Sequence, residues 1–112
     1  MENDKSESKH KGYITVAGMQ RVNNKVSGVY GGCIFEATVN NSRSKHGING
    51  GRVSQLYIWR FKKVAGRIAK RPTVNYELEW DLEPETKKDR IEYAAVLSYL
   101  EQLPSEASDK AA

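Results

Sequence analysis

The sequence contains one cysteine, Cys33, and two histidines, His10 and His46. A single thiol cannot form an intramolecular disulfide, and these three side chains do not have the spacing of a zinc site. No apolar run is long enough to cross a membrane, and the N-terminus lacks the hydrophobic segment of a signal peptide. We therefore predict a cytoplasmic protein that binds no metal and does not enter a membrane.

Catalytic and cofactor motifs are also missing. Cys33 alternates with Phe35 and Ala37, a pattern that predicts a buried thiol rather than a nucleophile. The Gly-rich segment 47–52 precedes a β-type run, whereas glycine loops that bind phosphate precede a helix. No nucleophile and base can be paired from the remaining residues. The sequence predicts a protein that is not an enzyme and uses no cofactor.

Apolar residues are scarce at both ends of the chain. Hydrophobic residues make up 38% of the 112 residues, somewhat below the average for a globular domain. Residues 1–11 contain no aromatic or branched apolar side chain, and residues 104–112 are mostly Ser, Glu, Asp, Lys and Ala. Such segments cannot bury enough apolar surface to offset the entropy of ordering. We predict two disordered tails, 1–11 and 104–112, and a single domain over residues 12–103.

Charge is divided unevenly along the chain, whose net charge is +4. Residues 12–75 contain eleven Lys and Arg residues and one acid, Glu36, whereas residues 76–112 contain ten acids and four basic residues. This asymmetry fits a polyanionic partner, and it also fits mutual attraction of the two parts within the fold.

The hydrophobic pattern predicts an α+β fold with an antiparallel sheet of four to six strands. β-type runs occupy 13–17, 26–30, 33–39, 52–61 and 73–82, and 64–69 is a weaker one. Gly31-Gly32 predicts a hairpin between two of them, and turns are expected within 19–25 and at Lys62-Lys63. The run 52–61 is apolar on both faces, which is typical of a central strand.

The run 73–82 alternates throughout. Five apolar residues (Val74, Tyr76, Leu78, Trp80 and Leu82) are expected to face the core. Glu77, Glu79, Asp81 and Glu83 would then form a row of carboxylates, which we expect to pair across the sheet with the basic strands.

One C-terminal helix is expected to pack across the sheet. Pro84 is placed to begin it and Pro104 to end it. Its apolar stripe, spaced by three and four residues, consists of Tyr93, Val96, Leu97, Leu100 and Leu103.

Two surfaces are candidate binding sites. The long polar loop 40–51 has a positive rim, and long loops are disproportionately functional. Our first hypothesis is an accessory binding protein that contacts a protein partner through Arg43, Lys45, His46, Asn49 and Arg52. The alternative is a nucleic-acid-binding protein, because basic residues interleave with aromatic ones further along. That surface would comprise Trp59, Arg60, Lys62, Lys63, Arg67, Lys70 and Arg71. Homodimer formation through an uncovered sheet edge is a further possibility.

Three segments, taken in order, resemble an uncharacterised family of short bacterial and phage proteins that are often carried on mobile elements. They are 30–39 (YGGCIFEATV), 45–58 (KHGINGGRVSQLYI) and 80–84 (WDLEP). The family pattern is a Gly-Ile-Asn-Gly-Gly-Arg loop before a strand, followed by a Trp-Asp-x-x-Pro junction from strand to helix. The resemblance covers about residues 28–100 and implies a sheet-plus-helix fold in a phage or mobile-element protein. It implies no activity.

Overall fold

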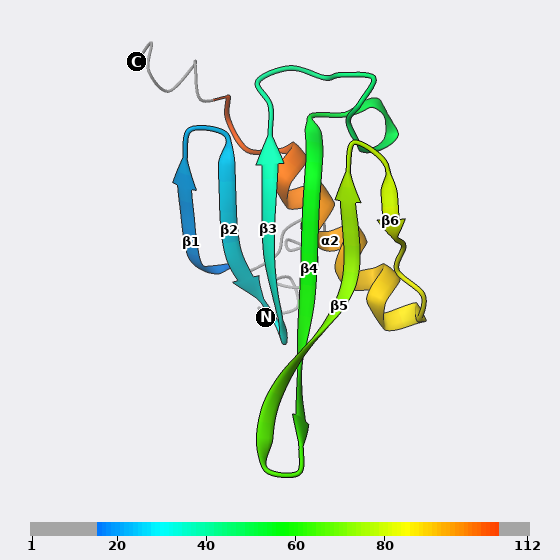
Figure 1. Ribbon diagram of the computed structural model, residues 1–112. Helices are drawn as coiled ribbons and strands as arrows, with labels where there is room; N and C mark the ends of the chain where they lie inside the picture. The colour runs from blue at the N-terminus through cyan, green and yellow to red at the C-terminus, as the bar shows by residue number, and fades with distance from the viewer. Residues whose placement is uncertain (1–15, 106–112) are drawn as a thin grey trace, which may run out of the picture.

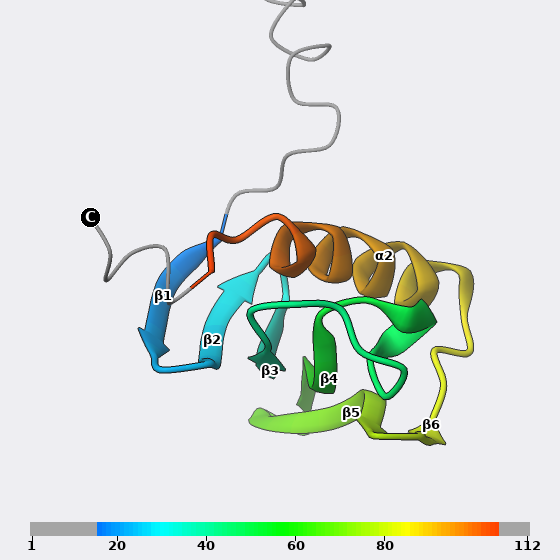
Figure 2. The same ribbon diagram turned by 90° about the horizontal axis from the view of Figure 1, so that it is seen from above.

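The computed structural model describes residues 16–105 as a six-stranded antiparallel sheet with one long helix across a single face (Figures 1 and 2). The strands lie side by side in chain order, so each pairs with its sequence neighbours. The predicted α+β fold is therefore confirmed. Its elements are β1 (Ala17–Val22), β2 (Lys25–Tyr30), β3 (Cys33–Val39), η1 (Ile48–Gly50), β4 (Val53–Val64), β5 (Arg67–Glu77), β6 (Trp80–Leu82) and α2 (Lys87–Glu101). The two predicted tails lie mostly outside the described residues, as do Tyr13, Ile14 and Thr15.

The hydrophobic core lies between the sheet and α2. Alternate residues of the central strands point toward the helix, which buries Val96 and Leu100 against them. Tyr99 packs edge-on against Phe35, with ring centroids 6.2 Å apart. The sheet contributes Val26, Cys33, Phe35, Ala37, Val39, Val53, Leu56, Ile58, Val74 and Tyr76 to the buried cluster, and the loop contributes Ile48. Tyr93 and Leu97 pack against it too, which confirms the predicted stripe within the helix, and Leu103 packs against it from just beyond the helix end.

The helix begins later than the prediction placed it. Thr86, not Pro84, is the N-cap: its side chain accepts a hydrogen bond from the Asp89 amide at 3.0 Å. The Asp89 carboxylate in turn accepts one from the Thr86 amide at 3.4 Å. This reciprocal pair is a capping box, which provides partners for amide groups that the first helical turn leaves open.

One turn prediction was too broad and another was wrong in position. Residues 19–22 belong to β1, and only Asn23-Asn24 form the turn, with Asn23 at φ +57°. Lys62-Lys63 lie inside β4, and the chain reverses instead at Ala65-Gly66, whose φ angles are +51° and +77°. A tight hairpin turn requires positive φ at its central residues, and alanine gave no sign that it would adopt one.

The predicted strand 73–82 is interrupted. Leu78 adopts φ +65° in a turn that separates β5 from β6, and 57% of its surface is exposed. Tyr76 therefore pairs with Trp80 across the turn instead of continuing toward it in one strand. Because the strand is broken, the predicted carboxylate row does not exist. Glu77 ends β5, Glu79 lies in the turn, Asp81 lies in β6 and Glu83 follows it.

The hairpin formed by β4 and β5 extends well beyond the other strands and twists as it leaves the sheet (Figure 1). We call its outer part, residues 61–70, the arm. Every residue of the arm is exposed, whereas the inner halves of the same strands bury Leu56, Ile58, Val74 and Tyr76. The arm therefore adds little to the core, and its composition is free to serve another purpose.

Candidate nucleic-acid interface

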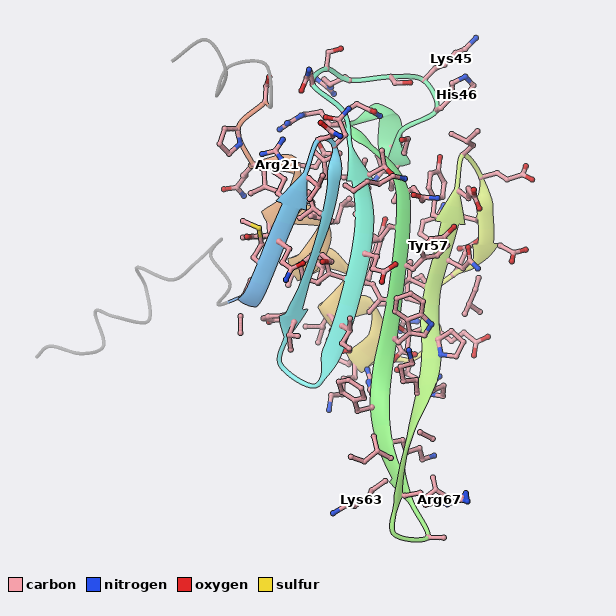
Figure 3. The ribbon with its side chains drawn as sticks, turned by 60° about the vertical axis from the view of Figure 1, so that its left-hand side comes forward. Arg21, Lys45, His46, Tyr57, Lys63 and Arg67 are labelled. Carbon is pink, nitrogen blue, oxygen red and sulfur yellow. The ribbon has the colours of Figure 1, made fainter. Side chains whose placement is uncertain are left out.

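The arm carries four cations at regular positions. Backbone pairing sets Phe61 opposite Lys70 and Lys63 opposite Ile68, and these pairs lie on the face of the sheet away from α2. Lys62 opposite Ala69 and Val64 opposite Arg67 lie on the other face. Each face therefore presents two positive charges, and Figure 3 shows Lys63 and Arg67 pointing to opposite sides of the ribbon.

Three cations in the outer part of the arm are exposed to solvent. Lys62, Lys63 and Arg67 have no ion-pair partner among residues 16–105. Lys70 Nζ lies 5.2 Å from the centroid of the Trp59 ring, a cation–π arrangement at the base of the arm. The arm also exposes three apolar side chains, with exposed fractions of 41% for Phe61, 50% for Val64 and 72% for Ile68.

Arg60 and Arg71, which the nucleic-acid hypothesis included, are engaged by the helix. They pair with each other across β4 and β5 on the face that α2 covers. Arg60 Nη2 lies 2.6 Å from Asp89 Oδ1 and 2.8 Å from Glu92 Oε1, while Arg71 Nη2 lies 3.3 Å from Asp89 Oδ1. The attraction between the basic and acidic parts of the chain is thus supplied by helix acids, not by the predicted strand acids.

Asp89 is the centre of this ionic cluster, and only 1% of its surface is exposed. Burial acts to raise the pKa of its carboxyl group, since it disfavours the charged form. Hydrogen bonds from Thr86 and the charges of Arg60 and Arg71 outweigh burial, so the pKa lies below its ordinary value. Asp89 is therefore ionised at neutral pH and joins the helix start to the base of the arm.

The uncovered face beside the arm is polar and partly acidic. Tyr57 donates a hydrogen bond to Glu77 at 2.9 Å and accepts one from Gln55 at 3.1 Å. The hydrogen bond to Glu77 raises the pKa of Tyr57, because it favours the protonated phenol. Glu36 is its backbone-paired neighbour on β3. Trp59 is the next residue of β4 on the same face, and its ring centroid lies 5.9 Å from that of Tyr57.

The loop hypothesis included Arg52, which the structure uses internally. Its side chain donates hydrogen bonds to the carbonyl oxygens of Asn40 at 2.9 Å, Glu101 at 2.9 Å and Leu103 at 2.6 Å. The Glu101 carboxylate accepts from the backbone amides of Arg52 at 2.8 Å and Val53 at 3.2 Å. We call this arrangement the Arg52–Glu101 clamp. It fastens the loop and the start of β4 to the end of α2.

Packing accounts for two glycines of the loop. A Cβ atom on Gly47 would lie 2.0 Å from the carbonyl oxygen of Gly51, and one on Gly51 would lie 2.3 Å from Glu101 Oε2. Neither residue has a positive φ, so space alone demands glycine. Buried Ile48 anchors the short η1 turn between them. The Gly-Ile-Asn-Gly-Gly-Arg segment is a compact structural connection.

The remaining loop candidates stay at the surface. Lys45, His46 and Asn49 are exposed, and the backbone oxygen of His46 accepts a hydrogen bond from Tyr76 at 2.9 Å. Arg43 is exposed too, and its Nε lies 3.4 Å from the oxygen of Gly50. Lys45 and His46 lie at the end of the molecule opposite the arm (Figure 3). The two predicted surfaces are therefore separate and can be altered independently.

Cys33 is fully buried, as the sequence predicted. Burial, followed by the nearby charge of Glu92, raises the pKa of its thiol to about 11. Few molecules carry the reactive thiolate at pH 8, and the sulfur is shielded from solvent. We expect a disulfide reagent to modify Cys33 at least a hundredfold more slowly in the native protein than in urea, as followed by absorbance. Equal rates in the two states would show that the thiol is accessible.

The arm is the feature that sequence reasoning missed. The sequence predicts these basic residues as a candidate surface, but a turn placed at Lys62-Lys63 divides the hairpin and hides its projection beyond the sheet. The available signal was composition: residues 61–71 hold five Lys and Arg residues, no acid and few apolar side chains able to fill a core.

Within residues 16–105, no group of His, Cys, Asp and Glu side chains could hold a metal ion, and no helix is long and apolar enough to span a membrane.

Comparison with known proteins identifies the family. A family model described as a domain of unknown function, DUF7678, matches residues 21–101, and the chain belongs to this family. No curated protein and no solved structure matches the chain. The match begins near the end of β1 and covers β2 to β6, the loop, the whole arm and α2.

Proposed function

We propose that this DUF7678 protein binds nucleic acid through the arm. The observation that carries the proposal is the projecting hairpin itself (Figure 1): its four cations form no ion pair with any acid in the described part of the chain, residues 16–105. Side chains held in a paired ribbon lose less freedom on binding than side chains in a flexible tail. Positive charge presented in this way matches the phosphate backbone, which supplies most of the affinity of sequence-independent binding.

The distribution of acids supports the same surface. The helix neutralises Arg60 and Arg71 at the base of the arm, so the uncompensated charge lies toward the tip. A polyanion would therefore meet Lys62, Lys63, Arg67 and Lys70 before any carboxylate. Attraction between the basic and acidic parts of the chain explains the positive charge at the base of the hairpin. It does not explain the positive charge of the arm.

The test is fluorescence anisotropy of labelled oligonucleotides titrated with the full chain at several salt concentrations. Four phosphate contacts predict a slope of log K against log salt of about −3 to −4, a loss of roughly a hundredfold between 50 and 200 mM salt. The double variant Lys63→Glu/Arg67→Glu is expected to weaken binding at least tenfold and to flatten that slope.

A matched control places the same charge reversal on the loop. Arg43→Glu/Lys45→Glu changes the net charge equally at the opposite end of the molecule and is expected to alter affinity less than threefold. An equal loss in both variants would mean that net charge, and not the arm, governs binding. No binding by the unmodified chain at 50 mM salt would refute the proposal.

A second candidate is a protein partner that docks on the loop. The Arg52–Glu101 clamp holds the loop rigidly while Lys45, His46 and Asn49 face solvent, which reduces the entropy cost of binding. A partner whose binding is lost in Lys45→Glu and kept in Lys63→Glu would support this function. The reverse pattern would assign the partner to the arm.

The phage or mobile-element setting is likewise proposed, and the genes that neighbour the coding sequence test it.

A further inference from the structure

We infer that the nucleic acid is a duplex and that the arm enters its major groove. This inference rests on the proposed function and specifies the ligand of the same site. It depends on three properties of the arm: which faces carry charge, how large the ribbon is, and which apolar side chains lie near its tip.

Positive charge on both faces of the arm favours binding in the groove of a duplex over binding of a single strand. Lys63 and Lys70 project from one face of the ribbon, and Lys62 and Arg67 project from the other. A ribbon inserted into a groove has a phosphate backbone on each side, so both pairs of cations find partners. A single strand laid across one face would leave the opposite pair unused.

The dimensions of the arm suit the major groove. From Phe61 to Val64 the strand advances about 10 Å at roughly 3.4 Å per residue, before the Ala65-Gly66 turn. The major groove of B-form DNA is about 8.5 Å deep and about 12 Å wide, and it admits a two-stranded ribbon. The minor groove, about 6 Å wide, is too narrow for a ribbon with side chains on both faces.

The uncovered sheet face is a poor platform for a single strand. Tyr57 lies between Glu36 and Glu77, whose carboxylates would repel phosphates. Trp59 already has Lys70 over its ring, so a stacking base would have to displace it. Tyr57 therefore has acidic neighbours, and the ring of Trp59 is already in contact with a cation.

Apolar side chains near the tip have a specific counterpart in the major groove. Ile68 is 72% exposed and Val64 is 50% exposed, and both lie in the last two residue pairs before the turn. The C5-methyl group of thymine is the apolar feature of the major groove, and aliphatic side chains contact it. We infer that Ile68 makes this contact.

The test compares one AT-rich 20-base-pair duplex, its two separated strands, and the same duplex with uracil in place of thymine. We expect the duplex to bind at least tenfold more tightly than either strand. Uracil removes only the major-groove methyl groups, and we expect it to weaken binding about fourfold, the effect of burying one methyl group. In Ile68→Ser the difference between thymine and uracil is expected to disappear.

The matched control is Ile91→Ser, because Ile91 is similarly exposed at 56% but lies on α2. It is expected to retain the thymine preference. Circular dichroism verifies that both variants fold. Strands that bind as tightly as the duplex would overturn the inference while leaving the proposed function intact. A duplex preference without a uracil effect would exclude the major-groove contact, and no binding to any probe would overturn the proposed function itself.

Discussion

Asp89→Ala is expected to lower the free energy of unfolding by about 3–5 kcal/mol, the usual cost of removing one partner from a buried ion pair. The substitution takes the carboxylate from Arg60 and Arg71 and also ends the capping box with Thr86. Glu92 still reaches Arg60, which keeps the loss from being larger. Urea denaturation followed by circular dichroism measures the change. Glu85→Ala, at an exposed position before the helix, serves as the control and should change stability by less than about 0.5 kcal/mol.

The same carboxylate predicts a dependence on pH. The pKa of Asp89 is lower in the folded protein than its ordinary value of 3.8, so its ionised form favours folding. This contribution is fully present above that ordinary value and is lost as the pH falls through the lower, folded pKa. Asp89→Asn should therefore lose less stability than the unmodified protein between pH 5 and pH 2. Identical acid profiles would show that Asp89 contributes nothing to acid unfolding.

Glu101→Ala is expected to cost about 3 kcal/mol or more, because the part-buried amides of Arg52 and Val53 lose their acceptor. Gly51→Ala is expected to cost about 1–3 kcal/mol, because its new Cβ overlaps the Glu101 carboxylate. The two losses should not add. In the double variant the obstructing carboxylate is absent, so most of the cost of Gly51→Ala should disappear.

Two other glycines serve as controls for the double-mutant cycle of Gly51→Ala and Glu101→Ala. Gly32→Ala places a Cβ with no atom within 4 Å and should be nearly neutral. Gly47→Ala collides with the backbone of Gly51, so Glu101→Ala should not rescue it. Chemical denaturation of the unmodified protein, the four single variants and the two double variants measures each change in stability. Additive losses for Gly51→Ala and Glu101→Ala would mean that the carboxylate does not determine the glycine.

Periodicity in the sequence was sufficient for most of the fold. Alternation identified Phe35 and Ala37 as core positions, and three- and four-residue spacing identified Val96 and Leu100. These inferences succeeded because burial acts on every residue of an element. Turns failed where a single residue adopts an unfavourable backbone conformation. Leu78 at positive φ is the example: the alternation of the sequence continues through it, yet the chain turns there, with the Leu78 amide donating to the Ser54 oxygen at 3.1 Å and Tyr76 pairing with Trp80.

The candidate site was predicted less well because it depends on contacts between distant residues. Arg60 and Lys62 have similar surroundings in the sequence, yet Arg60 forms ion pairs with Asp89 and Glu92, while no acid within the described residues pairs with Lys62. Arg52 likewise lies in a basic loop of the sequence, but in the fold its side chain donates to the backbone oxygens of Glu101 and Leu103 at the end of the helix and to that of Asn40. Which cations are free is decided by the docking of α2, and no local pattern reports that.

The neighbour-by-neighbour strand order has a consequence for how the chain folds. Every strand joins the one before it, so the sheet can grow by successive closure of loops, of which the 13-residue connection from β3 to β4 is the longest. Closing a loop costs entropy that rises with its length. Docking of α2 instead joins residues about 50 positions apart, as between Arg52 and Glu101. We therefore expect the sheet to form early in folding, because its contacts close short loops. The helix contacts have larger sequence separations and are expected to form later, so weakening them should mainly raise the unfolding rate.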